Sequence, residues 1–202
     1  MSSHFQAQNW SLQLTRAVKP APEKGIDPKE GFRIGVYRDR ASGLKVPVLG
    51  AAVSAGQLFD VFLSLLDPLG QVVDVVLETS HDSPAGQHRD LRRSGIDLAV
   101  LKSYLCEFEN LLLDDGCTGI AVVSRERPIE VQFDEHKTLI VYARDLRPFT
   151  RILLRHGLSR DDSLRLIFEG QHLHFSEPRY VGDFHQLTLR LGAGVPAEQV
   201  SW

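Results

Sequence analysis

The segment TGIAVVSRERPIEVQFDEHKTLIVYARDLRPFTRILLRHGLSRDDSLRLIFEGQHLHF, residues 118–175, decides the fold that the sequence predicts. Residues 119–123 form a short apolar run, which is typical of a strand buried on both faces. Residues 129–133 alternate between apolar and polar side chains, which indicates a strand with one solvated face. A third apolar run at 139–142 follows a charged turn. These runs predict an antiparallel meander of three strands.

The second part of this segment predicts a helix and a returning strand. Apolar residues recur at spacings of three and four over 145–157, which favours an amphipathic helix. Residues 164–168 then alternate as a strand, and a second strand returns after the turn at 169–170. Alternate side chains of an extended strand share a face, so we expect His172 and His174 to lie on the same side of the returning strand.

The first half of the chain has a similar order of elements. Residues 32–93 contain two alternating strands, a helix at 54–66 and a further apolar strand. Shifted by about 91 residues, their apolar positions align with those of 118–175. We therefore hypothesise two related strand-strand-helix-strand halves, linked by an amphipathic helix at 95–113 that Ser94 caps. The alternative is that any two amphipathic segments of this kind can be aligned.

These patterns together predict an α+β fold, in which helices pack on a largely antiparallel sheet. We expect a single domain over residues 32–192 and a short tail at 193–202. Residues 1–31 combine proline, glycine and charged residues, which is typical of a flexible N-terminal arm. Residues 177–192 fit either a helix or a strand, and we favour the helix.

The composition limits the class of protein. Of the 202 residues, 43% are hydrophobic and 24% are charged, which is typical of soluble globular proteins. The formal net charge of −3 argues against nucleic-acid binding, which usually needs a basic domain. Cys106 and Cys117 match neither a zinc framework nor a disulfide scaffold. We see no secretory signal and no membrane-spanning segment, so we expect a cytoplasmic protein.

Three histidines near the C-terminus form the first candidate site. His172 and His174 are expected on one face of a strand, and His185 follows within the last predicted helix. Paired imidazoles suit zinc or iron when a third ligand approaches from elsewhere. The alternative is that these histidines are polar residues on a solvated strand face.

The loop between the two halves contains a second set of candidates, His81, Asp82 and His88. A nucleophile needs a base within hydrogen-bond distance and an acid that orients the base, and residue types of this loop offer all three. Neighbours in sequence rarely adopt that geometry, and no nucleophile-elbow motif is present. A solvated loop with local Asp and Ser turns is the alternative.

Four arginines at helical spacing form the third candidate site. Guanidinium groups bind phosphate and carboxylate groups bidentately, so the row predicts an anion site or a surface for an acidic partner. The alternative is an ordinary solvated helix face with salt bridges. The residues of this arginine row are Arg144, Arg147, Arg151 and Arg155.

The sequence contains no motif that fixes a chemistry, because Walker, dinucleotide-binding and HExxH patterns are all missing. We assign no cofactor from the sequence. The prediction is a non-catalytic interaction or regulatory module, present as a homodimer or bound to an acidic protein partner. The alternative predictions are a metal-dependent enzyme that uses the histidines and an anion-binding protein that uses the arginine row.

Overall fold

The computed structural model describes residues 12–38, 43–81 and 88–194 of the chain. Its main element is a seven-stranded sheet in the order β2-β3-β8-β7-β6-β4-β5, in which every neighbouring pair is antiparallel. A second sheet pairs two short strands, β1 with β9. Helices accompany both sheets, which confirms the predicted α+β fold.

The strands are β1 (Val18–Pro20), β2 (Gly31–Arg38), β3 (Lys45–Ala52), β4 (Val72–Thr79), β5 (Arg89–Asp97), β6 (Thr118–Ser124), β7 (Ile129–Phe133), β8 (Leu139–Ala143) and β9 (His172–His174). The α-helices are α1 (Ala55–Leu65), α2 (Leu98–Glu107), α3 (Glu109–Asp114), α4 (Arg147–Arg155) and α5 (Pro178–Leu191). Two 3-10 turns, η1 (Asp67–Leu69) and η2 (Ile167–Glu169), complete the described elements.

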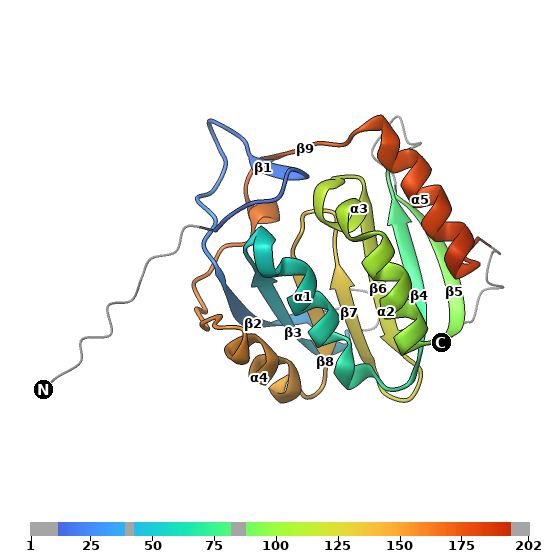
Figure 1. Ribbon diagram of the computed structural model, residues 1–202. Coiled ribbons are helices and arrows are strands. Elements are labelled where there is room, and N and C mark those ends of the chain that lie inside the picture. The colour runs from blue at the N-terminus through green and yellow to red at the C-terminus, as the bar shows by residue number, and fades with distance from the viewer. Residues whose placement is uncertain (1–11, 39–42, 82–87, 195–202) are drawn as a thin grey trace, which may run out of the picture.

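The helices cover one face of the main sheet (Figure 1). Helices α1, α2 and α3 lie in front of its central strands, α5 lies beside β4 and β5, and α4 lies near β2, β3 and β8. The small β1–β9 sheet lies at one end of this arrangement, near the end of α3. It is this small sheet that positions the candidate site described below.

The core lies between the main sheet and its helices. Alternate residues of β4 and β8 are buried against the helices, as period-2 strands require. Phe62 of α1 meets Phe133 of β7 edge to face, with ring centroids 5.1 Å apart. The largest fully buried side chains include Tyr180, Phe32, Phe62, Phe133, Phe149, Leu49, Leu58, Leu65, Leu66, Leu69, Leu77 and Leu101.

The predicted helix at 95–113 differs from the observed structure. Strand β5 continues to Asp97, which pairs with Val72 of β4, so the helix begins only at Leu98. The N-cap is Asp97 rather than Ser94, because Oδ1 of Asp97 accepts hydrogen bonds from two backbone amides of the first turn at 2.8 and 3.2 Å. The helix also breaks at Phe108 into α2 and α3.

The C-terminal third also departs from the prediction in one element. The expected strand at 164–168 is a loop followed by η2, whereas the helix favoured for 177–192 is confirmed as α5. Gly192 ends α5 with a left-handed φ of 61°. The strand that follows α4, β9, pairs with β1 instead of joining the main sheet as β4 does. The two proposed halves therefore end differently, and their relationship stays a prediction.

The described part of the predicted N-terminal arm packs against the rest of the chain. Strand β1 pairs with β9, and Ala17 and Val18 are buried against Ile167. The amide of Ala55 donates to the carbonyl of Gln13 at 2.8 Å. Among the described residues, no helix is both long and apolar enough to cross a membrane.

Candidate metal centre

Strand β9 presents His172 and His174 on one side. Its register with β1 pairs His172 with Pro20 and His174 with Val18. Backbone hydrogen bonds extend the ladder at both ends, from Ala21 to Gln171 at 2.8 Å and from Phe175 to Ala17 at 2.7 Å. Because the strand is extended, the two imidazoles project to the same side, as the sequence predicted.

The third member of the cluster is His136, which lies in the turn between β7 and β8. Asp134 closes this turn, because its carbonyl accepts from the amide of Lys137 at 3.0 Å and its Oδ1 accepts from the amide of Thr138 at 2.9 Å. Lys137 has a φ of 60°, a left-handed conformation that costs free energy for a residue with a side chain. This turn directs His136 toward β9.

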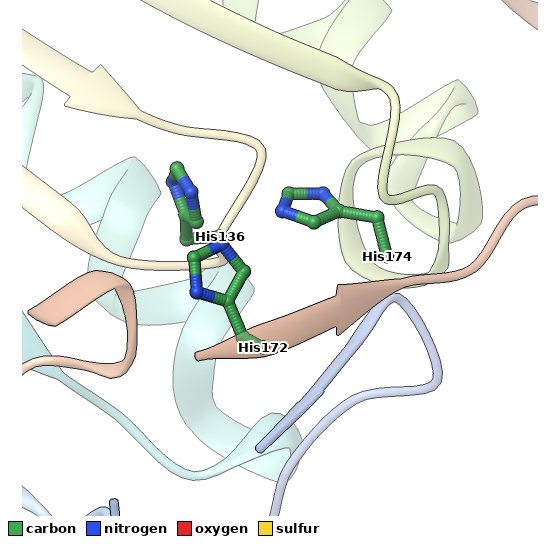
Figure 2. Close-up of side chains that lie close together, drawn as sticks. All are labelled: His136, His172 and His174. Atoms are coloured by element: carbon green, nitrogen blue, oxygen red, sulfur yellow. The ribbon is translucent and has the colours of Figure 1, made fainter. Parts of the chain in front are cut away.

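The three imidazoles lie close together (Figure 2): His136 meets each of the other two rings edge to face, and the rings of His172 and His174 are tilted by 56°. The ring centroids are 4.7 Å apart for His136 and His172, 5.0 Å for His136 and His174, and 5.0 Å for His172 and His174. One ring nitrogen of each histidine lies within 4.8 Å of the corresponding nitrogens of the other two. His174 is exposed and the other two are half-buried, so solvent reaches the cluster.

Each of the three rings has an oxygen acceptor at Nδ1. The Nδ1 atom of His136 lies 2.9 Å from Oδ2 of Asp134. The corresponding atoms of His172 and His174 lie 2.8 Å and 2.6 Å from the carbonyl oxygens of Gly170 and Gly116. A carbonyl oxygen only accepts hydrogen bonds, so the proton of each neutral ring is on Nδ1. The Nε2 lone pairs are therefore free to bind a metal ion.

Glycine is required at both positions that supply the carbonyl oxygens. A Cβ atom on Gly116 would lie 2.5 Å from the carbonyl oxygen of Ala17 and 2.8 Å from that of Phe175. A Cβ atom on Gly170 would lie 2.8 Å from a side-chain carbon of Ile26 and 3.0 Å from its amide nitrogen. Close backbone packing around the small sheet thus positions the acceptors of His172 and His174.

The environment shifts the pKa of two of these histidines in opposite directions. Burial lowers the pKa of His174 below its ordinary value. Burial also acts to lower the pKa of His136, but the hydrogen bond and negative charge of Asp134 outweigh it and raise that pKa above its ordinary value. A carboxylate that accepts from Nδ1 increases the basicity of Nε2, which is the usual second partner of a metal-bound histidine.

The donor set fits a divalent first-row transition metal. Imidazole nitrogen suits Zn²⁺, Cu²⁺, Ni²⁺ and iron, and three protein ligands leave a coordination position for water. Bonds of about 2.1 Å in a tetrahedral site place the ligand nitrogens about 3.4 Å apart. The ligand nitrogens of the three rings now lie within 4.8 Å of one another, so only a small inward movement of the rings is needed.

A small cavity lies beside one of the three histidines. A cavity of about 20 Å³ adjoins His136 and is lined by Lys137, Thr138 and apolar residues of the N-terminal segment. This is room for roughly one water molecule. Lys137 is buried, which lowers the pKa of its amine to about 8, and its Nζ donates to the carbonyl of Thr118 at 2.9 Å.

The structure separates His185 from the other two predicted metal candidates. His185 lies exposed on α5 and lines a different cavity, together with His81. The sequence analysis did not single out His136. Its only local signal is the polar turn Asp134-Glu135-His136-Lys137, which places a carboxylate two residues before the imidazole.

The two loop candidates that the structure describes, His81 and His88, have different carboxylate neighbours. His81 lies beside Asp115, and Nε2 of His88 lies 3.2 Å from Oε1 of Glu135. Asp82 lies outside the described residues.

The arginine row is exposed along its whole length. Arg147 forms a bidentate pair with Asp145 at 2.8 Å. Arg144 and Arg147 line an open groove with Arg160, which itself pairs with Asp162. Recognition of an anion or an acidic partner by this row stays a prediction, as does the homodimer.

Comparison of this chain with protein-family models, with curated proteins and with solved structures gave no match.

Proposed function

We propose that this chain binds a divalent transition metal ion such as Zn²⁺ through Nε2 of His136, His172 and His174. The observation that carries the proposal is the common anchoring of the three rings at Nδ1. Each anchor orients its ring and leaves the opposite nitrogen unprotonated toward the other two rings. Hydrogen-bonded second partners of this kind are typical of metal-binding histidines.

Electrostatics favours the same conclusion. The negative charges of Asp134 and Glu135 act on His136 and favour a cation among the three rings. The cluster is open to solvent, so an ion can enter. The left-handed backbone at Lys137 adds to this argument, because such strain tends to occur at binding sites.

The number of protein ligands favours the metal-dependent enzyme over the non-catalytic module. Structural zinc sites usually have four protein ligands, whereas catalytic sites have three and keep a position for water. A bound ion of this kind supplies a water molecule with a lowered pKa. The residues of this chain hold and orient that ion, and the adjoining small cavity suits a water-sized ligand.

Elemental analysis of protein purified without added metal, then reconstituted with Zn²⁺ and dialysed, tests the proposal. The informative variant replaces two ligands, His172→Gln and His174→Gln. The matched control is His185→Gln, which changes an exposed histidine outside the cluster. We expect the double variant to retain one ion per chain fewer than the wild type and the control. Equal metal content in all three proteins would contradict the proposal.

A further inference from the structure

A second group of metal-ligating side chains lies next to the three-histidine cluster. His81 lies two residues after the end of β4, and Asp115 and Cys117 lie in the connection between α3 and β6. One possible ligand atom of each residue lies within 4.8 Å of those of the other two. The amide of Ser80 donates to the carbonyl of Cys117 at 3.0 Å and so holds the two segments together.

His81 supplies the observation that points to a ligand. Its side chain is only 6% exposed, and its Nε2 is buried without a hydrogen-bond partner among the described residues. That nitrogen nevertheless lies 2.9 Å from Oδ2 of Asp115. The two atoms form an ion pair when His81 is protonated, and when His81 is neutral they offer two ligand atoms to one cation. An unsatisfied buried nitrogen costs free energy, which a bound cation removes.

Asp115 is a preformed ligand. Its carboxylate is buried, accepts from Oγ1 of Thr118 at 2.5 Å and lies 3.3 Å from the amide of Cys117. Burial acts to raise its pKa, but contacts with His81, Ser176 and Thr118 outweigh burial and hold the pKa below its usual range. These contacts hold the carboxylate in one orientation.

Cys117 adds a sulfur donor to the cluster. Burial raises the pKa of its thiol. A coordinated metal ion deprotonates a thiol directly, so the same environment is compatible with a sulfur ligand. Nitrogen, oxygen and sulfur together form a donor set suited to Zn²⁺ and Co²⁺.

We propose that His81, Asp115 and Cys117 form a second site for a divalent cation of the zinc type, separate from the three-histidine site. A cavity of about 120 Å³ between β4, β5 and α5 is lined by His81 and His185, and it provides a path to this site. The two sites share a segment, because Gly116 lies between two ligands of the second site and accepts from His174 of the first. Their ligand sets have no residue in common.

Titration of the metal-free chain with Co²⁺ tests the second site independently of the first. A cobalt–thiolate bond gives a charge-transfer absorption in the near ultraviolet, which imidazole ligands do not give. The variants are Cys117→Ser and, in case that change disturbs folding, His81→Gln. The matched control is Cys106→Ser, because Cys106 is exposed and belongs to neither cluster. Circular dichroism checks that each variant is folded.

We expect the absorption in the wild type, in Cys106→Ser and in the His172→Gln/His174→Gln double variant. We expect its loss in Cys117→Ser, and a loss or a weaker affinity in His81→Gln. Absence of the band in the wild type would overturn the second site, as would its persistence in Cys117→Ser or its disappearance in Cys106→Ser. The band does not depend on the three-histidine site, so failure of one proposal is distinguishable from failure of the other.

Discussion

The two candidate sites use the same short segment in different ways. Residues 115–117 form a turn between α3 and β6, which brings Asp115 and Cys117 close together, and both contribute to the mixed site. The carbonyl of Gly116 accepts from His174 and anchors the three-histidine site. One site is open to solvent and has three identical donors. In the other the three donors differ, the side chains of His81 and Asp115 are buried and Cys117 is half-buried. Exposure and donor type therefore distinguish two sites that one backbone segment organises.

This difference has consequences for exchange and selectivity. A solvated cluster of imidazoles allows an ion and a small ligand to enter and leave. A buried set that contains a thiolate and a carboxylate retains its ion more strongly and selects softer ions. Substitutions in and near the shared segment therefore test whether the two sites depend on each other.

The largest effect is expected from Gly116→Ala, because this residue is common to both sites. The added Cβ would lie 2.5 Å and 2.8 Å from two backbone oxygens, so neighbouring backbone must move. Overpacking of this kind costs about 3 kcal/mol, and we expect both sites to lose affinity together. Chemical denaturation and metal titration of the same protein measure the two effects.

Gly56→Ala is the matched control, because a Cβ atom there meets nothing within 4 Å in α1. It should leave both metal affinities unchanged and stabilise the chain by about 0.5–1 kcal/mol. If Gly116→Ala behaves like Gly56→Ala, the shared segment does not organise the two sites.

A smaller, pH-dependent effect is expected from Lys137, whose amine joins the histidine-bearing turn to Thr118. Burial lowers its pKa from 10.5 to about 8 in the folded chain. Between these values the unfolded chain binds more protons than the folded chain, so stability rises with pH. In the presence of a chelator, the stability of wild type relative to Lys137→Met should rise by roughly 3 kcal/mol at most over this range. If the difference in stability between the two proteins does not change with pH, the pKa of this amine is not lowered in the folded chain.

The smallest effect is expected from Asp134→Asn, which should act on the three-histidine site alone. The amide group of Asn, when turned toward His136, donates where the carboxylate accepted, so the proton moves to Nε2 and blocks the metal ligand. Loss of such a second partner typically weakens metal binding by about 10–100-fold. The cobalt–thiolate absorption should be unchanged. A parallel loss at both sites would indicate a general disturbance of the fold.

The sequence was sufficient to predict what depends on local periodicity. The alternation at 129–133 and the apolar runs beside it predicted the strands of the meander, and alternation also placed His172 and His174 on one face. The apolar spacing of residues 177–192 fitted a helix or a strand, and the helix that we favoured is α5.

The rest depends on contacts between distant parts of the chain. His136 joins the cluster only because β9 pairs with β1. No local pattern in residues 18–20 predicts that pairing. The proline-rich composition of the N-terminal segment predicted a flexible arm, whereas tertiary packing buries Ala17 and Val18. The sequence did not predict Asp115 and Cys117 as metal ligands. They meet His81 only because β4, which precedes His81, pairs with β6, which follows Cys117.

Anomalous diffraction at the zinc absorption edge, from crystals of the chain grown with Zn²⁺, tests the central claim most directly. The account predicts an anomalous peak at bonding distance from Nε2 of His136, His172 and His174, with each Nδ1 still donating to its oxygen acceptor. Absence of density among the three rings, or an ion bound to Nδ1 instead, would contradict the account.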